Sequence, residues 1–313
     1  MNKEKNFMSA VIYVHNEENR IETFLQMLIK VLENNFEHSE IICVNDCSED
    51  NSVEKIKLAS KRAAGTSISV LNMSYFHGME LAMNAGVDLA IGDFVFEFDT
   101  VEADYDKEEI MRVYRRSLEG YDIVSAAPDK REKFTSRCFY KIFSRFARLS
   151  GQMRTESFRI LSRRVLNRVS SMNKAVPYRK AVYGNCGLRT DIIIYKICEK
   201  EKQPGKKSRK EKKYKMGLAV DSLLLFTEVG YRFSIAMTML MMLMAVFMVV
   251  YSLVTYLISH PVAGWTTTIL FLSVVFFGLF GILTIIIKYL QLLVELVFKR
   301  KRYTFESIEK FTK

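Results

Sequence analysis

Short apolar runs alternate with segments whose apolar positions recur every three or four residues through the first 130 positions. Runs rich in β-branched residues predict buried strands, and the three-to-four spacing predicts amphipathic helices. Five strands are expected, at Ser9–Val14, Glu40–Asp46, Ser67–Met73, Asp93–Asp99 and Asp122–Ala127. Four helices are expected between them, at Glu17–Leu32, Ser48–Lys61, Gly78–Ala90 and Lys107–Leu118. This alternation predicts an α/β fold, a mainly parallel sheet with helices on both faces.

The pattern changes from about Arg131. Arg131–Arg148 is expected to form a basic amphipathic helix, and Met216–Tyr231 a second amphipathic helix. Ser157–Val169 is expected to be a strand that turns into a helix. Packing against a bilayer surface and ordinary docking on the sheet both remain open for the two amphipathic helices.

Two long apolar runs follow, Phe233–Ile258 and Trp265–Ile287, and no Asp, Glu, Lys or Arg occurs from the start of the first to the end of the second. Each exceeds the roughly 20 residues that a helix needs to cross about 30 Å of hydrocarbon. The short link between them, SHPVAG, allows only a tight turn. The runs therefore predict a transmembrane hairpin of two antiparallel helices.

Basic residues flank the hairpin on both sides. Nine lysines and arginines lie in Lys200–Lys215 and four in Lys299–Arg302, whereas the turn has none. Because basic residues stay on the cytosolic side, both ends of the hairpin are expected in the cytosol and the turn outside. Topology and anionic lipid then explain much of the net charge of +11, and no nucleic-acid partner is expected.

The predicted organisation has four parts: an α/β domain (1–200), a basic loop with a juxtamembrane helix (201–232), the hairpin (233–298) and a basic cytosolic tail (299–313). No strand is expected beyond Leu218. The first residues lack an apolar stretch long enough for a signal peptide. The five cysteines show neither zinc spacing nor a disulfide framework, which suits a reducing compartment.

Polar residues leave the carboxyl ends of three predicted strands: Asn16 and Glu17, Asp46, and Asp99. Ligands of parallel sheets bind beyond these ends. Converging carboxylates favour a ligand that binds together with a cation. For Asn16 and Glu17, capping of the following helix is the alternative.

The strand ends also resemble a known family. Val11–Ile21, VIYVHNEENRI, is similar to the opening strand and Asn-Glu-Glu turn of family 2 glycosyltransferases of the GT-A fold. Ile41–Ser52, IICVNDCSEDNS, resembles their Val-Asp-Asp-Gly-Ser-x-Asp turn. His77–Asp99 resembles their Gly-x-x-x-Ala, Ala-Gly and Ala-x-Gly-Asp series that ends in Asp. The resemblance implies a GT-A fold.

Three further segments resemble one group of that family, the polyprenyl-phosphate glycosyltransferases related to dolichol-phosphate mannose synthase and to bacterial undecaprenyl-phosphate enzymes. Phe158–Leu166, FRILSRRVL, is similar to their Phe-Arg-Leu-x-x-Arg-x-Val segment. Pro261–Leu272 and Lys288–Ser307 resemble their second membrane helix and its exit. The resemblance covers nearly the whole chain.

The resemblance implies a membrane-bound inverting hexosyltransferase. It would move a sugar from a nucleotide sugar, a UDP-sugar by preference, to an undecaprenyl-type phosphate on the cytosolic leaflet. The lipid-linked sugar would serve cell-wall or other polysaccharide. The implied location is a bacterial plasma membrane, with several spans and with the catalytic domain and both termini cytosolic; self-association into a homo-oligomer stays open.

The resemblance also implies roles for residues. Asp99 and Glu156 would be catalytic, and Asp99 with Glu102 would hold Mg²⁺ or Mn²⁺. Asp99→Asn would then abolish transfer and leave thermal stability nearly unchanged. The nucleotide sugar would contact the strand ends, at Val14, Asn16, Glu17, Asp46, Gly78 and Asp99. The acceptor phosphate would contact Lys130, Arg131, Ser136 and Arg137.

The chain departs from the family pattern at several of these positions. The Asp-x-Asp motif reads Asp99-Thr100-Val101, with Glu102 and Asp104 close behind. The first Asp of the Asp-Asp-Gly-Ser turn is Asn45, and the acidic segment before Phe-Arg-Leu keeps only Glu156. The alternative function is therefore a non-catalytic GT-A membrane scaffold or partner subunit. The loop Asp99–Asp104 discriminates between the two, because a metal site requires its carboxylates to meet.

Overall fold

A computed structural model describes residues 3–129, 155–171, 179–198, 229–259, 264–297 and 303–311. The chain divides into two compact units, Met1–Ala219 with Arg300–Lys313, and Val220–Lys299. The predicted basic helix Arg131–Arg148 and the predicted acceptor residues Lys130, Arg131, Ser136 and Arg137 lie outside the described residues. The basic loop before the hairpin lies outside them as well.

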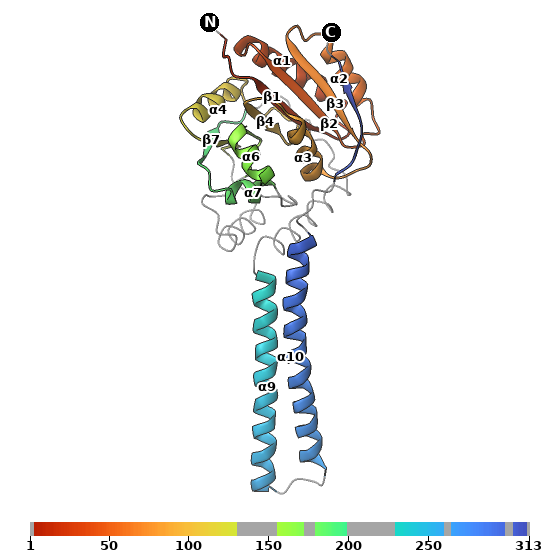
Figure 1. The fold of residues 1–313 in the computed structure, drawn as a ribbon, viewed down its shortest axis with the longest axis vertical. Coiled ribbons are helices and arrows are strands. Elements are labelled where there is room, and N and C mark those ends of the chain that lie inside the picture. Colours follow the sequence, from red (N-terminus) through yellow and green to blue (C-terminus); the bar gives the residue numbers. More distant parts are fainter. Residues whose placement is uncertain are drawn as a thin grey trace. The chain divides into compact units, whose positions relative to one another are not determined.

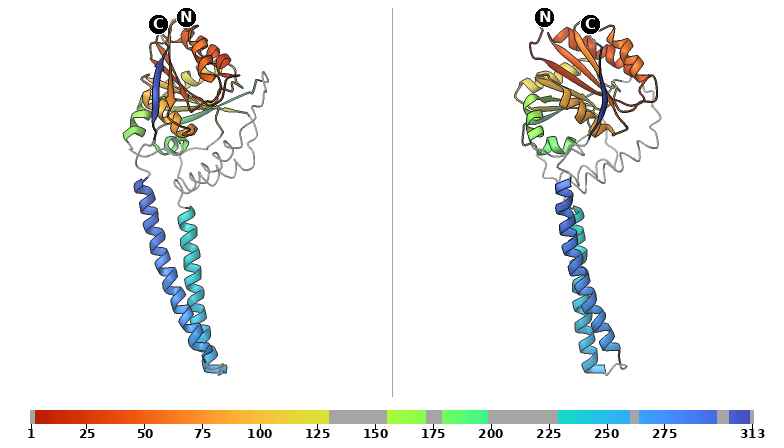
Figure 2. Two further views of the ribbon diagram at one scale, coloured as in Figure 1. Left: turned by 90° about the vertical axis from the view of Figure 1, so that its right-hand side faces the viewer. Right: turned by 45° about the vertical axis from the view of Figure 1, so that its right-hand side comes forward.

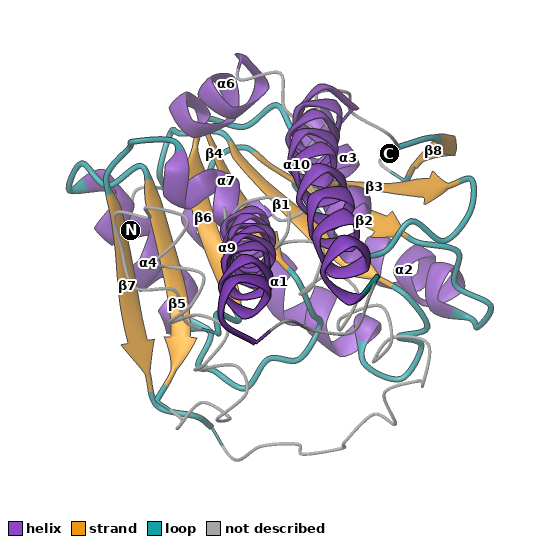
Figure 3. Cartoon of the chain, turned by 90° about the horizontal axis from the view of Figure 1, so that it is seen from below, coloured by secondary structure: helices purple, strands orange, loops and turns teal. Residues whose placement is uncertain are grey.

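The first unit is built on a mixed sheet with the strand order β7-β5-β6-β4-β1-β2-β3-β8 (Figure 3). Its strands are β1 (Met8–Val14), β2 (Ser39–Asn45), β3 (Thr66–Met73), β4 (Phe94–Phe98), β5 (Ile123–Pro128), β6 (Phe158–Ser162), β7 (Thr190–Tyr195) and β8 (Phe305–Lys310). Strand β6 runs antiparallel to β4 and β5, and β8 runs antiparallel to β3. The other pairs are parallel. All five strands predicted in the first 130 residues are confirmed within one residue at each end.

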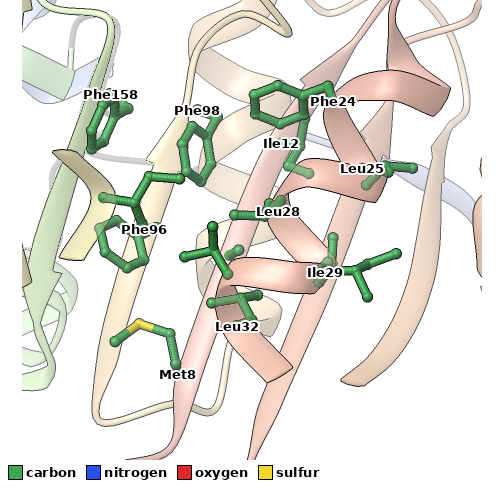
Figure 4. Close-up of a cluster of buried hydrophobic side chains, with 14 of the residues drawn as sticks. Met8, Ile12, Phe24, Leu25, Leu28, Ile29, Leu32, Phe96, Phe98 and Phe158 are labelled. Carbon is green, nitrogen blue, oxygen red and sulfur yellow. The ribbon is translucent and has the colours of Figure 1, made fainter. Parts of the chain in front are cut away.

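Helices cover both faces of the sheet, as predicted (Figure 1). They are α1 (Ile21–Asn35), α2 (Ser52–Ser60), α3 (Met79–Leu89), α4 (Glu108–Leu118), α6 (Arg163–Ser171) and α7 (Arg179–Asn185). Side chains of α1, α2 and α4 join one buried cluster with alternate residues of β1 and β4, including Ile12, Phe96 and Phe98 (Figure 4). Side chains of α3, α6 and α7 join a second cluster with the intervening positions, such as Val11 and Val95. Because successive side chains of a strand point to opposite faces of the sheet, each strand contributes to both buried clusters.

Helices α1 and α2 each begin four residues later than predicted, at Ile21 and Ser52. The residues before them form loops at the carboxyl ends of β1 and β2, and these loops bond to one another. The amide of Glu17 donates to Ser52 Oγ at 2.8 Å, and the amide of Glu18 donates to Asp50 Oδ2 at 2.9 Å. Helix α1 has no side-chain cap, so Asn16 and Glu17 do not serve it in that way.

The tail after the hairpin (299–313) differs from the prediction in its secondary structure. Residues beyond the hairpin were expected to contain no strand, and this is wrong, because β8 pairs with β3 from Ser69 to Met73 (Figure 2). Tyr303 Oη also donates to Asp88 Oδ2 at 2.6 Å. The tail therefore completes the sheet of the first unit.

The second unit contains α9 (Val229–Ser259) and α10 (Trp265–Val297). Stretches of 25 and 26 residues within them are long and apolar enough to cross a membrane. Small side chains seven residues apart on α9, Thr238, Ala245 and Ser252, are buried, as small residues at helix contacts in membranes are. Large apolar side chains such as Leu243, Phe247 and Phe271 are more than 60% exposed among the described residues, so α9 and α10 do not cover these side chains for each other.

Candidate active site

The candidate site lies where the sheet order reverses. From β1 the chain passes to β2 on one side, whereas β4 lies on the other side of β1. Both neighbours are parallel to β1, so the carboxyl ends of all three strands share one edge. Such a switch point opens the crevice in which ligands of α/β sheets bind. Asn16, Asp46 and Asp99 follow these three strands, as the sequence predicted.

Asp46 joins three loops at this edge. Its carboxylate is fully buried and accepts from the amides of His77 and Gly78, both at 2.8 Å, and from Tyr13 Oη at 3.0 Å. Its own amide donates to the carbonyl of Val14 at 2.9 Å. Gly78 has a φ of 81°, a conformation that glycine adopts without strain. Asp46 therefore fixes the loops around it, and both of its carboxylate oxygens accept hydrogen bonds.

Asn16 bridges the first two loops. It has a φ of 55°, and its side-chain oxygen accepts from the amide of Glu49 at 2.8 Å. Its own amide donates to Ser48 Oγ at 3.1 Å. Glu17 forms an ion pair with Arg20 at 2.7 Å. These predicted donor-site residues lie together at the strand ends.

Exposed aromatic side chains line the loop after β3. Tyr75 and Phe76 are 59% and 41% exposed. The ring of Phe76 lies 4.8 Å from that of His15, and the ring of Tyr75 stacks 3.9 Å from that of His77. Aromatic faces at the carboxyl edge of a sheet suit a planar base.

The tail reaches the same loop. His77 Nδ1 lies 2.6 Å from the carbonyl of Tyr75, and Nε2 lies 3.2 Å from the amide of Thr304. A carbonyl can only accept and an amide can only donate, so Nδ1 carries the proton and Nε2 accepts. The segment before β8 thus holds the loop that also supplies two amides to Asp46.

Asp99 lies in a buried cluster of charges. Its Oδ1 accepts from Arg179 Nη2 at 2.5 Å, and its Oδ2 accepts from Arg159 Nη2 at 2.7 Å. Both arginines also lie 3.0 Å from Glu97 Oε2, which is fully buried in β4. Glu97 stands directly opposite Arg159 in the pairing of β4 with β6.

Two more elements contribute to this cluster. Glu80, from α3, accepts from the amide and the Nε of Arg179 at 2.9 and 3.0 Å. Tyr183, from α7, donates to Glu97 Oε1 at 2.7 Å. Glu156, predicted to be catalytic, lies 3.1 Å from Arg159 Nε and 3.8 Å from Lys180 Nζ. Glu156 and Asp99 therefore share Arg159.

The cluster fixes the charge of its members. Burial by itself raises the pKa of Asp99, but the charges of Arg179 and Arg159 outweigh burial and hold this pKa well below its usual range. For Arg179, burial lowers the pKa, and the surrounding carboxylates, led by Asp99, raise it above the ordinary value. Burial raises the pKa of Tyr183, and Glu97 adds to the rise. Asp99 is therefore ionised and both guanidiniums are charged at all ordinary pH values.

The carboxylates of the loop Asp99–Asp104 each bind different partners. Glu102 Oε1 accepts from Arg20 at 2.6 Å, and Asp104 Oδ1 accepts from Tyr195 at 2.6 Å. Val101, at the position of the second motif Asp, is 3% exposed and packs in the core. The described residues contain no group of three or more His, Cys, Asp or Glu that could hold a metal ion.

Electrostatics at Asp99 also oppose a metal ion. An ion bound to this carboxylate would lie within about 5 Å of both guanidiniums. At an effective dielectric constant of about 20, each would repel a divalent ion by about 7 kcal/mol. The predicted pair of Asp99 and Glu102 therefore does not fit a bound divalent ion.

Sequence reasoning missed Arg179, Glu97, Glu80 and Tyr183. One signal was present: Glu97 interrupts the apolar strand Phe94–Phe98, and a buried carboxylate requires a partner. The partners Arg159 and Arg179 were hidden, because they lie more than 60 and more than 80 residues further along the chain.

Comparison with known proteins identifies the family. The model of glycosyl transferase family 2 matches residues 9–172. An uncharacterized glycosyltransferase of Synechocystis sp. is 30% identical over 194 residues, which are 60% of each chain. A prophage bactoprenol glucosyl transferase homologue of Escherichia coli is 26% identical over 62% of this chain and 64% of its own. An undecaprenyl-phosphate 4-deoxy-4-formamido-L-arabinose transferase of Proteus mirabilis is 35% identical over 41% of this chain and 38% of its own.

The first two matches span about 60% of the relatives' length. Among solved structures, a Pyrobaculum calidifontis mannosyltransferase in complex with GDP-Man and Mn²⁺ aligns with a TM-score of 0.46 and 12% identity, over 62% of this chain and 57% of its own. A Mycobacterium tuberculosis glucosyl-3-phosphoglycerate synthase with Mn²⁺ and UDP aligns with a TM-score of 0.48 and 11% identity, over 71% and 80%. The family model covers just over half of the sequence, including β1 to β6 and the switch point, and the chain therefore belongs to glycosyl transferase family 2.

Proposed function

We propose that this protein is a membrane-bound glycosyltransferase that moves a sugar from a nucleotide sugar, a UDP-sugar by preference, to a polyprenyl phosphate on the cytosolic leaflet. The observation that carries the proposal is the family match over the strand ends that form the switch-point site. Two apolar helices in the same chain agree with a lipid acceptor. Relatives named as bactoprenol and undecaprenyl-phosphate transferases use acceptors of this kind.

The donor is proposed to bind at the carboxyl ends of β1, β2 and β3. The rings of Phe76 and Tyr75 offer faces for the base. Val14, Asn16, Glu17, Asp46 and Gly78 remain the proposed donor-site residues. Of these, Asp46 is a positioning residue, because its carboxylate holds the amides of His77 and Gly78. The loop geometry is thus set before the nucleotide arrives.

The proposed reaction is a single displacement with inversion. An oxygen of the lipid phosphate attacks the anomeric carbon, and the bond from that carbon to the nucleoside diphosphate breaks. A phosphate monoester has a second pKa of about 6, so the nucleophile is already largely a dianion at neutral pH. Positioning and charge neutralisation then matter more than a strong base. Asp99 and Glu156, which share Arg159, are proposed to face the reacting sugar.

The acceptor phosphate is proposed to bind Arg131 and Arg137, with Lys130 and Ser136 beside them. Arginine suits bidentate contact with phosphate. Arg131→Ala and Arg137→Ala should each raise the apparent KM for lipid phosphate roughly ten- to hundredfold, the loss expected from one charge-assisted contact. The KM for the nucleotide sugar should change far less. Titration in uncharged detergent micelles removes nonspecific attraction to anionic lipid, and unchanged curves there would exclude this acceptor site.

Transfer is tested by incubating the purified full chain with radiolabelled nucleotide sugars and undecaprenyl phosphate, with Mn²⁺ in one series and EDTA in another. A labelled lipid that requires both substrates is the expected result. Absence of a labelled lipid with every sugar tested, in both series, would contradict the proposal.

A non-catalytic scaffold is the second candidate. It is favoured by the loop after β4, where Glu102 binds Arg20, Asp104 binds Tyr195 and Asp99 binds Arg159 and Arg179. A scaffold would bind lipid phosphate or a partner transferase and would turn over no nucleotide sugar. The assay above separates the candidates when it is paired with a measurement of UDP release, which a scaffold would not show.

A further inference from the structure

Arg179 is a cation enclosed by carboxylates. Its side chain is 1% exposed, and its nitrogens face three different acids. Nε donates to Glu80 at 3.0 Å, Nη1 lies 3.0 Å from Glu97, and Nη2 donates to Asp99 at 2.5 Å. These acids come from α3, from β4 and from the loop after β4, so a single guanidinium joins three elements.

The cluster is close to neutral without any added ion. Among the described residues, four carboxylates, Glu80, Glu97, Asp99 and Glu156, face three cations, Arg159, Arg179 and Lys180, which leaves a net charge of −1. Both oxygens of Asp99 accept from guanidiniums. The position that would supply a second carboxylate is the buried Val101.

If Asp99 bound a metal ion in place of Arg159 and Arg179, the buried guanidiniums would lose a carboxylate that compensates their charge. Uncompensated buried charges are strongly unfavourable. A metal ion could therefore bind Asp99 only if Arg179 moved away from the three carboxylates around it. The amide of Arg179 is held as well, by Glu80 at 2.9 Å. The start of α7 thus fixes the arginine through its main chain and its side chain together.

We propose that Arg179 is a built-in cation at Asp99, taking the place of a divalent ion there, so that the donor site works without a metal ion bound to Asp99. The claim that the donor site works without a metal ion rests on the proposed transferase function. The claim that Arg179 occupies the place of a metal ion at Asp99 does not.

A guanidinium differs from a metal ion in ways that matter for this site. It cannot be removed by a chelator, it cannot exchange with the medium, and its three edges fix the directions of the three carboxylates. The site would therefore be ordered before any nucleotide binds. Sugar transfer, if present, would persist in EDTA.

The test measures Mn²⁺ binding by electron paramagnetic resonance, in which the free ion gives a six-line signal that falls on binding. The full chain in detergent is titrated with Mn²⁺, alone and with UDP, against UDP in buffer. Wild type and Asp99→Asn should give the same curves, because no ion binds through Asp99. A wild-type site that weakens at least tenfold in Asp99→Asn would overturn the proposal.

Arg179→Met provides the converse arm, because it leaves Glu80, Glu97 and Asp99 without their shared cation. This variant should gain Mn²⁺ affinity over wild type by tenfold or more, whereas Arg179→Lys, which keeps the charge, should not. Arg116→Met is the matched control, since Arg116 pairs with Asp191 at the surface. If the variants at 99 and 179 do not fold, the wild-type titration decides: no tightly bound ion supports the proposal, and one ion per chain overturns it.

Sugar transfer is assayed separately in EDTA and in Mn²⁺. A chain that is inactive in both media counts against the transferase and leaves the Mn²⁺ result standing. A chain that is active only with Mn²⁺, and whose Mn²⁺ affinity depends on Asp99, would overturn the built-in cation while supporting the transferase.

Discussion

Arg159 and Arg179 are the two largest fully buried side chains among the described residues. Each is neutralised by carboxylates from other elements. Buried ion pairs add little net stability compared with apolar residues, but removing one partner is costly because the other is left without compensation. At the scale of single residues, the charge cluster therefore decides which substitutions the site tolerates.

Asp99→Asn tests this dependence. The substitution removes the charge of a carboxylate that binds both arginines and leaves Glu97 as the other acid between them, so the free energy of unfolding should fall by about 3 to 5 kcal/mol. The expectation from sequence, nearly unchanged stability, is replaced by this one. Calorimetric melting in detergent measures the effect, and Asp191→Asn, at a surface ion pair with Arg116, should lower the melting temperature far less, because exposed ion pairs contribute little. Equal melting of wild type and Asp99→Asn would show that the cluster is not coupled to folding.

The stability difference between wild type and Asp99→Asn should also depend on pH. The pKa of Asp99 in the folded state is lowered, chiefly by Arg179 and Arg159 acting against burial. Such a group contributes stability that is fully present above the unfolded pKa of about 3.9 and is lost as pH falls toward the folded value. The difference in melting temperature between wild type and Asp99→Asn should stay constant from pH 8 to pH 5 and shrink only below pH 4. A difference that changes between pH 8 and pH 6 would assign it to another group.

At this scale the sequence located the residues but not their partners. Asp46 and Asp99 could be found because they end apolar strands. What they bind could not be found, because His77, Arg159 and Arg179 reach them through the fold. A role inferred from position alone, such as a metal ion shared by Asp99 and Glu102, fails when the fold gives these carboxylates other partners, here arginines.

At the scale of elements, α3 lies very close to the sheet at Gly86. A Cβ atom on Gly86 would lie 2.5 Å from a methyl carbon of Val11 and from one of Val44. The small residue lets α3 lie directly on β1 and β2, which places Gly78 and Glu80 at the strand ends. Gly86 is therefore a packing requirement of the site.

Gly86→Ala should lower the unfolding free energy by about 1 to 3 kcal/mol, because the added methyl overpacks a filled core. Gly65→Ala is the matched control, since a Cβ there meets nothing within 4 Å. The control should be neutral or slightly stabilising. Melting curves of the two variants against wild type measure both effects, and similar losses in the two would contradict the close contact.

A soluble fragment of the first unit must include β8, because this strand pairs with β3. Replacing residues 220–299 by a flexible linker of about 20 residues, with ends about 25 Å apart on average, should give a soluble protein that keeps β8 on β3. A chain that stops at Ala219 should melt lower and aggregate, because the edge of β3 is then unpaired. Ile308→Pro in the linked protein is the control, since Ile308 pairs with Leu71 and proline interrupts a ladder. The strand has no role in stability if all three proteins melt alike.

The sequence predicted the first five strands because each buries a run of apolar residues on one or both faces. It missed β8, whose residues FESIEK include three charges and whose Phe305 and Ile308 are about half exposed. An edge strand of this composition is formed by backbone pairing with β3, and local pattern does not reveal pairing with a strand more than 230 residues away. Strand β7, the other edge strand, was missed as well, although Ile192–Ile194 is a run of β-branched residues.

At the scale of the whole molecule, the sheet includes residues from both sides of the hairpin. Strands β1 to β7 precede α9, and β8 follows α10. If the two helices each cross the bilayer, the chain must cross an even number of times to return to the same unit. The connectivity thus agrees with the basic flanks in favouring one side for both ends.

This topology is tested with a cysteine reagent that cannot cross membranes. A cysteine replacing Thr267, beside the turn, should react in intact cells, whereas one replacing Lys5, in the first unit, should react only after lysis; the native cysteines are replaced in both proteins. Carbonate washing should leave each protein in the membrane, because two spanning helices bury more apolar surface than a peripheral helix does. Reaction at position 5 in intact cells, or release by carbonate, would contradict the hairpin.

The return of β8 to the sheet also changes how the protein could be shed from a membrane. A protein with one anchoring segment at its end is released by a single proteolytic cut. Here the first unit is continuous with the hairpin at two points, before α9 and after α10. A cut before α9 leaves β8, still joined to α10, paired along β3, and a cut after α10 leaves the rest of the unit joined to α9. Release therefore requires two cuts, or one cut and the loss of a strand, so nicked protein should remain in the membrane fraction.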